Sequence, residues 1–115
     1  MDNVVARLMR YAKVWSESDY HANRGTTPST DRQFDMARLL VEELHGMGVD
    51  NAFVDDTCYV YASLPATPGC EHLPVIGLIA HMDTTPDMTG KDVKPQILHY
   101  DGGDLVLNPE QNIVM

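Results

Sequence analysis

Apolar residues recur at helical spacing in two stretches of the first half of the chain. In the first stretch they fall on one side of a helix that we predict from Asp2 to Trp15, with Asp2 as its N-cap. In the second stretch a similar stripe predicts a helix over about residues 30–47. Thr30 and Gln33 have the spacing of a capping box at its start. The polar residues 16–28 between the stripes, which include Asn23, Gly25 and Pro28, predict a loop.

After the second helix the pattern changes to that of strands. Ala52–Asp55 and Tyr59–Leu64 are joined by a turn too short for a crossover helix, so we expect them to be antiparallel. Val75–Ala80 is apolar on both faces, which is typical of a central strand covered by helices on both sides. Ile97–Tyr100 and Leu105–Leu107 resemble a hairpin around a Gly-Gly turn. The pattern therefore predicts an α/β fold with a mixed sheet.

Composition narrows the class of protein further. The chain has 115 residues and a net charge of −9, which argues against a nucleic-acid-binding face and against attraction to anionic membranes. Its longest wholly apolar run, Val75–Ala80, is too short to span a bilayer. Met1–Trp15 mixes apolar and charged residues, unlike a signal peptide, so we expect a cytoplasmic location. The apolar ending Ile113–Met115, with no cap or helix after it, indicates a cut chain.

Two cysteines are too few for a disulfide framework, and their spacing fits no zinc motif. We expect both to be free thiols, Cys58 in a strand and Cys70 in a loop.

The candidate chemistry lies at the end of the apolar strand, where ligands bind in open α/β sheets. His81 follows that strand, and Asp83 points to the same side if the chain stays extended. Imidazole is a good zinc ligand, and a neighbouring carboxylate can orient it. The alternative is structural, with His81 a hydrogen-bonded histidine and Asp83 the cap of a turn; the spacing alone favours this alternative. The second such triplet, His99-Tyr100-Asp101, we interpret as surface.

The segment 78–87, Leu-Ile-Ala-His-Met-Asp-Thr-Thr-Pro-Asp, resembles the first metal motif of the co-catalytic zinc aminopeptidases related to aminoacylases and glutamate carboxypeptidases. Other segments resemble one branch of them, the tripeptide aminopeptidases (peptidase T). These segments are residues 27–30, 63–66, 90–96, 100–104 and 106–108. The likeness runs in order along essentially the whole chain.

The resemblance implies the N-terminal part of a three-layer α/β/α zinc-peptidase domain over residues 1–115, without the lid domain and the rest of the catalytic domain. Two zinc ions would serve a complete site that cleaves tripeptides. His81 corresponds to a zinc ligand and Asp83 to the catalytic acidic residue that orients it. The bridging Asp, the general-base Glu and the other ligands would lie beyond residue 115. The isolated chain is then expected to be inactive, with at most one partial zinc site. The alternative function is that of a non-enzymatic fragment that associates with itself, as a homodimer or in another form, or that of an interaction module.

Overall fold

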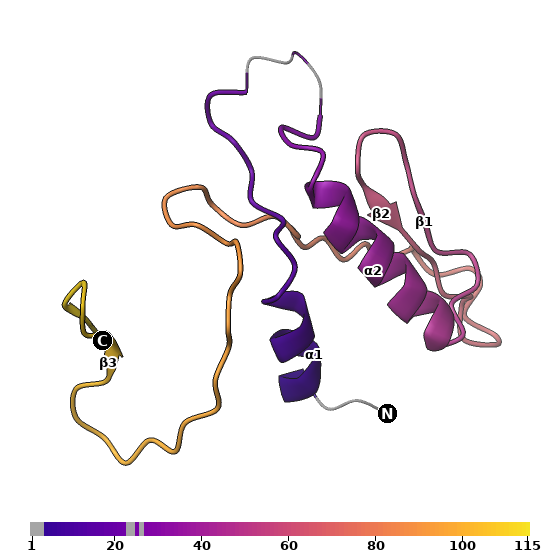
Figure 1. The fold of residues 1–115 in the computed structure, drawn as a ribbon. Helices are drawn as coiled ribbons and strands as arrows, with labels where there is room; N and C mark the ends of the chain where they lie inside the picture. The colour runs from indigo at the N-terminus through magenta and orange to yellow at the C-terminus, as the bar shows by residue number, and fades with distance from the viewer. Residues whose placement is uncertain (1–3, 23–24, 26) are drawn as a thin grey trace.

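A computed structural model describes residues 4–22, 25 and 27–115 of the chain. Two helices come first, α1 (Val4–Tyr11) and α2 (Gln33–Gly46). Four short strands follow, β1 (Phe53–Val54), β2 (Val60–Tyr61), β3 (Val106–Asn108) and β4 (Ile113–Val114). In Figure 1, α2 lies against the β1–β2 hairpin, and a long tail carries β3 away from this body.

Both predicted helices are present, but their ends differ from the prediction. The predicted cap at Asp2 lies outside the described residues. α1 ends at Tyr11 rather than at Trp15, because the amides of Lys13 and Val14 bond three residues back, as Val14 does to the Tyr11 carbonyl at 3.0 Å. The predicted capping box is wrong. Thr30 donates its hydroxyl to the Glu17 carbonyl instead, at 2.7 Å, and no side chain caps the first amides of α2.

β1 and β2 are antiparallel, as predicted, and Phe53 pairs with Tyr61. The two rings stack with their centroids 5.4 Å apart, which is a favourable cross-strand pair. The turn between the strands is held by the Asp55 carboxylate, which accepts the amide hydrogen of Tyr59 at 2.8 Å. Cys58 was predicted to lie in a strand. It lies in this turn instead, with its φ angle at 68°.

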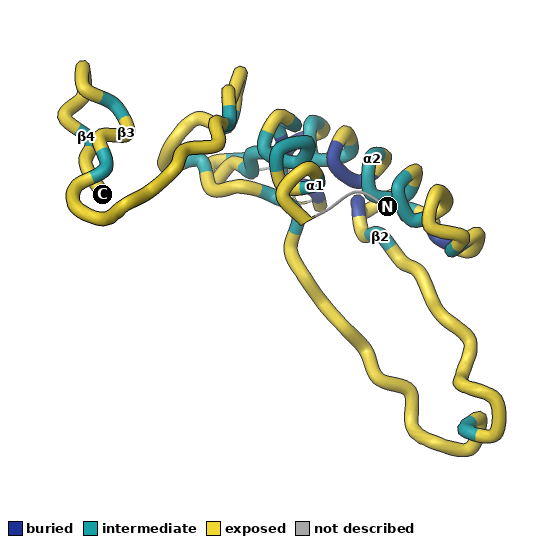
Figure 2. The backbone as a smooth tube through the Cα atoms, turned by 90° about the horizontal axis from the view of Figure 1, so that it is seen from below, coloured by how far each residue is buried: buried dark blue, intermediate teal, exposed yellow. Residues whose placement is uncertain are grey.

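The prediction of a buried central strand over Val75–Ala80 is wrong in this structure. No described segment forms a ladder with these residues, and the Val75 and Ile79 side chains are 97% and 100% exposed. These residues follow β2 in the chain, and Figure 2 shows the backbone leaving the body after β2 in a long exposed excursion that returns beside α1. A strand needs a hydrogen-bonding neighbour, which apolar side chains alone do not supply.

The C-terminal hairpin is formed by residues further along the chain than predicted. β3 pairs antiparallel with β4 around a turn at residues 109–112, while Ile97–Tyr100 has no strand partner among the described residues. Asn108 accounts for the difference. Its side-chain oxygen accepts the Gln111 amide hydrogen at 3.0 Å, and the Asn-Pro dipeptide that it begins favours turn initiation. The Gly-Gly segment forms only a bend, in which the Tyr100 hydroxyl donates a hydrogen bond to the Gly103 carbonyl at 2.8 Å.

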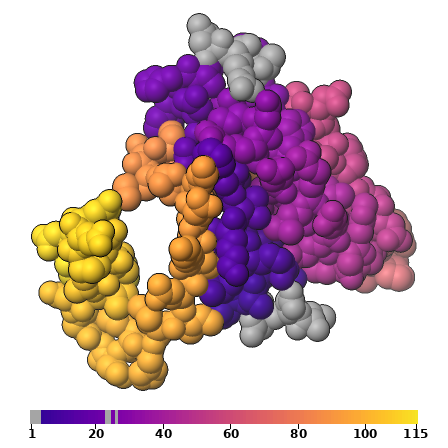
Figure 3. Space-filling model, viewed as in Figure 1, coloured from indigo at the N-terminus to yellow at the C-terminus, as the bar shows by residue number. Residues whose placement is uncertain are grey.

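The core is small and lies between α2 and the β1–β2 hairpin. Its buried apolar side chains are Met36, Ala37, Ala52 and Cys58. The radius of gyration is 18.1 Å, against about 13 Å for a compact domain of this length. Figure 3 shows why, since the tail stands off the body and leaves an open gap. Many large apolar side chains are exposed, Ile79 in the excursion after β2 among them.

The architecture is compatible with the predicted α/β class, because it has helices and small antiparallel sheets. The predicted mixed sheet is not what the described residues form, since both of their sheets have two antiparallel strands. Their one parallel pairing is an isolated bridge between Glu17 and Thr84. Within the described residues, no helix is long and apolar enough to cross a membrane.

Candidate metal centre

The segment that carries His81 and Asp83 is held against the chain just after α1. The Ser18 amide donates to the Thr84 carbonyl at 2.9 Å, and the Thr84 amide donates to the Ser16 carbonyl at 3.3 Å. The Ser16 hydroxyl adds a bond to the Met82 carbonyl at 3.1 Å. These bonds tie together residues that are 66 to 68 positions apart in the sequence, and they fix the backbone of the segment that carries the candidate ligands.

His81 and Asp83 point to the same side and contact each other. The His81 Nδ1 lies 3.0 Å from the Asp83 carbonyl oxygen and 3.3 Å from its carboxylate Oδ1. Both partners accept hydrogen bonds, so Nδ1 carries the proton and donates it. The Nε2 lone pair then has no proton on it, and the His81 side chain is 86% exposed. This is the arrangement of a metal-binding imidazole oriented by a carboxylate, so the pair fits one zinc ligand with its support.

The loop after Asp83 closes on Glu17. The Glu17 carboxylate accepts the Gly90 amide hydrogen at 2.8 Å and the Trp15 indole hydrogen at 3.2 Å. The bond from Gly90, followed by that from Trp15, holds the pKa of Glu17 below its ordinary value. A Cβ added at Gly90 would lie 3.1 Å from the Thr84 hydroxyl, so a larger residue here fits only if that hydroxyl moves by a few tenths of an ångström.

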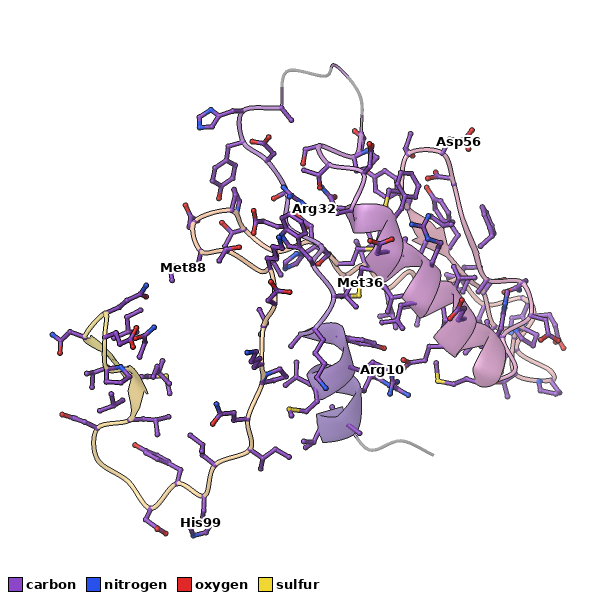
Figure 4. All side chains as sticks on the ribbon, viewed as in Figure 1. Arg10, Arg32, Met36, Asp56, Met88 and His99 are labelled. Carbon is purple, nitrogen blue, oxygen red and sulfur yellow. The ribbon has the colours of Figure 1, made fainter. Side chains whose placement is uncertain are left out.

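Two cations cover the Trp15 ring beside this loop. The Arg32 guanidinium lies 4.2 Å from the ring centroid, and the Lys91 ammonium lies 5.4 Å from it. The Arg32 Nε also donates to the Glu17 carbonyl at 2.8 Å. Figure 4 labels Arg32 at the start of α2, beside the crossing of the two segments. These contacts therefore join three parts of the chain at one place: the start of α2, the segment just after α1 and the loop after Asp83.

A cleft of about 1080 Å³ runs beside the candidate ligands. It is lined by residues 78–83 and by residues of both helices and the β1–β2 turn, including Tyr11, Glu43 and Leu44. The cleft is open and mixes apolar with charged lining, so it can admit a solvent-exposed ligand next to His81.

The described residues bring together one candidate ligand and not a complete metal site. No three of their His, Cys, Asp and Glu side chains gather closely enough to hold a metal ion. The second triplet lies on the surface, as predicted: His99 and Asp101 are 2.9 Å apart, and their side chains are 88% and 84% exposed. Figure 4 shows His99 far out on the tail. Both cysteines are free thiols, as predicted, with Cys58 buried.

Sequence reasoning missed Ser16, Glu17 and Gly90 as supports of the site. Their pattern is that of an ordinary polar loop, because the bonds that they form depend on which distant segment lies alongside. The one available signal was Gly90, a residue that is used where two backbones approach closely.

Known proteins resemble the chain along its whole length. It is 50% identical to peptidase T of Alkaliphilus oremlandii over 117 aligned residues, covering 100% of this chain and 28% of that protein. It is 50% identical to peptidase T of Geobacillus kaustophilus, covering 97% of this chain and 27% of that protein. Peptidase T of Clostridium acetobutylicum is 45% identical, over 100% of this chain and 28% of that protein. No family model matches the chain.

The matches show first that this α/β chain, with its oriented histidine, is related to peptidases. More narrowly, these relatives are all peptidases T, and the chain is 45–50% identical to them over the part of their length that it covers. The chain spans little more than a quarter of the length of the curated relatives that it matches, about 28% of the first.

Proposed function

We propose that the full-length protein is a zinc-dependent aminopeptidase that releases the N-terminal residue from tripeptides by two-metal hydrolysis. The relationship to peptidase T supports the reaction class. One observation in this chain supports the metal: the His81 ring donates from Nδ1 to Asp83, which leaves Nε2 free to bind. We also propose a cytoplasmic location, which the two free cysteines support because reducing compartments keep thiols unpaired.

In this proposal, His81 is a zinc ligand through Nε2. Asp83 holds the ring in the required tautomer and makes the imidazole a stronger ligand. Bound zinc supplies an activated water and a charge that stabilises the developing oxyanion. We further propose that residues 1–115 form part of a three-layer α/β/α domain. In that domain, segments elsewhere in the full-length protein would lie beside Val75–Ala80 and supply the remaining ligands and the general base.

The two His-x-Asp triplets offer a matched test in the full-length protein. We expect His81→Ala to abolish tripeptide hydrolysis and to reduce the zinc bound after dialysis, as measured by atomic absorption. His99→Ala removes an equally exposed histidine from the tail and should leave both unchanged. Equal activity of the two variants would refute the proposed role of His81. The isolated chain of 115 residues should be inactive, because it holds no complete metal site among its described residues.

The second candidate is that the isolated chain associates with a second copy of itself. The exposed run from Val75 to Ile79 favours it, because uncovered apolar side chains with free backbone edges drive pairing between copies. Sedimentation of the isolated chain should show a dimer at micromolar concentration. Ile79→Asp should shift it towards monomer, whereas Ile97→Asp in the tail should not. A clean monomer for the unmodified chain would exclude this candidate.

A further inference from the structure

We infer that Ser16 is a positioning residue for the candidate ligand pair. Its hydroxyl, by donating to the Met82 carbonyl between His81 and Asp83, sets the orientation of the His81 ring. The catalytic meaning of this inference rests on the proposed function, whereas its geometric part does not. Nothing about the sequence around Ser16 marks it as part of a site.

Ser16 is unusual because it is polar and completely buried. Its relative exposure is 0%, and it is the largest fully buried side chain among the described residues. Its Oγ lies 3.1 Å from the Met82 carbonyl oxygen, and its own carbonyl accepts the Thr84 amide hydrogen at 3.3 Å. Ser16 therefore contacts the backbone on both sides of Asp83. A buried hydroxyl needs a hydrogen-bond partner, because a buried polar group without one lowers the stability of the fold.

The Met82 carbonyl controls how the two functional side chains face each other. In an extended segment, residues two apart point to one side, and the peptide groups between them set their relative tilt. The Met82 carbonyl belongs to the peptide that joins Met82 to Asp83. Rotation of that peptide would turn Asp83 away from the His81 ring. The contacts at 3.0 and 3.3 Å leave little room for such a rotation, because hydrogen bonds weaken steeply with distance and angle.

The consequence is a particular tautomer of His81. With Asp83 in place, Nδ1 faces two acceptors and carries the proton, so Nε2 is free to bind a metal. If the Met82 carbonyl is released, this double acceptor is lost. The exposed ring then returns to the tautomer mixture of a free imidazole in water.

The chain contains a matched control two residues away. The Ser18 hydroxyl also donates to a carbonyl of the same segment, that of Thr84, at 3.1 Å. That carbonyl already accepts the Ser18 amide hydrogen at 2.9 Å, and the side-chain bond is exposed. Removing the Ser18 hydroxyl therefore leaves the segment tied, whereas removing the Ser16 hydroxyl leaves the part-buried Met82 carbonyl without that donor.

The first measurement is the tautomer of His81, from ¹⁵N shifts of the neutral imidazole in the full-length protein. The unmodified protein should favour the Nδ1-protonated form. Ser16→Ala should shift His81 towards the free-imidazole mixture, and Ser18→Ala should not. Ser16→Cys, nearly the same size but a weak donor, should shift it in the same direction and serves if the alanine variant does not fold. An unchanged tautomer in a folded Ser16 variant would overturn the inference.

The second measurement is zinc affinity, by competition with a chromophoric chelator. We expect Ser16→Ala to weaken zinc binding by about tenfold, the usual effect of losing a group that supports a ligand, and Ser18→Ala to leave it unchanged. If the unmodified protein binds no zinc and cleaves no tripeptide, the proposed function fails, while the tautomer still decides the role of Ser16. If it does both and the two variants bind zinc equally, the positioning role fails and the proposed function stands.

Discussion

Glu43 is the point through which α2 holds α1. Its carboxylate accepts hydrogen bonds from the Arg10 guanidinium at 2.5 Å and the Tyr11 hydroxyl at 2.8 Å, and it pairs with the Arg7 guanidinium. α1 has no buried residue of its own. Three side chains of α1 bond to this one carboxylate of α2, so we predict that Glu43→Ala loosens the helix.

The size of the effect follows from burial. The Glu43 side chain is 12% exposed, while those of Arg7 and Arg10 are 33% and 36% exposed. A hydrogen bond to a charged group contributes about 1.5–3 kcal/mol when well buried, and an exposed ion pair about 0–1 kcal/mol. Because the carboxylate is mostly buried and its partners only partly so, we expect Glu43→Ala to cost about 2 kcal/mol in total.

Urea titration followed by far-ultraviolet circular dichroism measures this loss as a shift of the midpoint. The dependence on pH gives a second measurement. The hydrogen bond from Arg10, followed by that from Tyr11, lowers the pKa of Glu43 below its ordinary value of 4.5. A carboxyl group with a lowered pKa stabilises the fold above that ordinary value, and its contribution disappears as the pH falls through the folded-state pKa. The difference between the unmodified chain and Glu43→Gln should therefore shrink below about pH 4.5.

The matched control is Glu42→Ala, which removes the same side chain from the neighbouring, exposed position of α2. It should change the free energy of unfolding by less than about 0.5 kcal/mol. If Glu43→Ala and Glu42→Ala have the same midpoint, or if the Glu43→Gln difference persists unchanged at low pH, the assignment of Glu43 as the attachment of α1 is wrong.

Two further predictions concern other turns of the chain. Gly90→Ala places a Cβ 3.1 Å from the Thr84 hydroxyl, so it should open the loop and speed amide exchange at residue 90, measured by NMR; exchange as slow as in the unmodified chain would contradict this. Asp55→Asn removes the charge of a carboxylate that accepts the Tyr59 amide hydrogen. This hydrogen bond is the main cause that lowers the pKa of Asp55. The substitution should weaken the β1–β2 turn, seen as a lower thermal midpoint than that of the control Asp56→Asn, and equal midpoints would count against it.

Local patterns in the sequence determined the elements that depend on neighbouring residues. The apolar stripes located both helices, and the short turn after Asp55 required antiparallel strands, since no crossover fits there. The triplet at His81 was also visible, because residues two apart share a face of an extended chain and need no distant partner to meet.

Tertiary structure decided whatever depends on a partner far along the chain. Val75–Ala80 has the composition of a central strand, yet it forms no ladder in the described chain, because a strand exists only beside another. Thr30 has the spacing of a capping box, yet its hydroxyl donates its hydrogen bond to the Glu17 carbonyl. The support of the candidate ligands by Ser16 is of the same kind, because its bond to Met82 joins segments 66 residues apart. Sequence spacing shows which side chains can meet locally, whereas the partner of a buried hydroxyl or a strand edge is chosen by which distant segment lies against it.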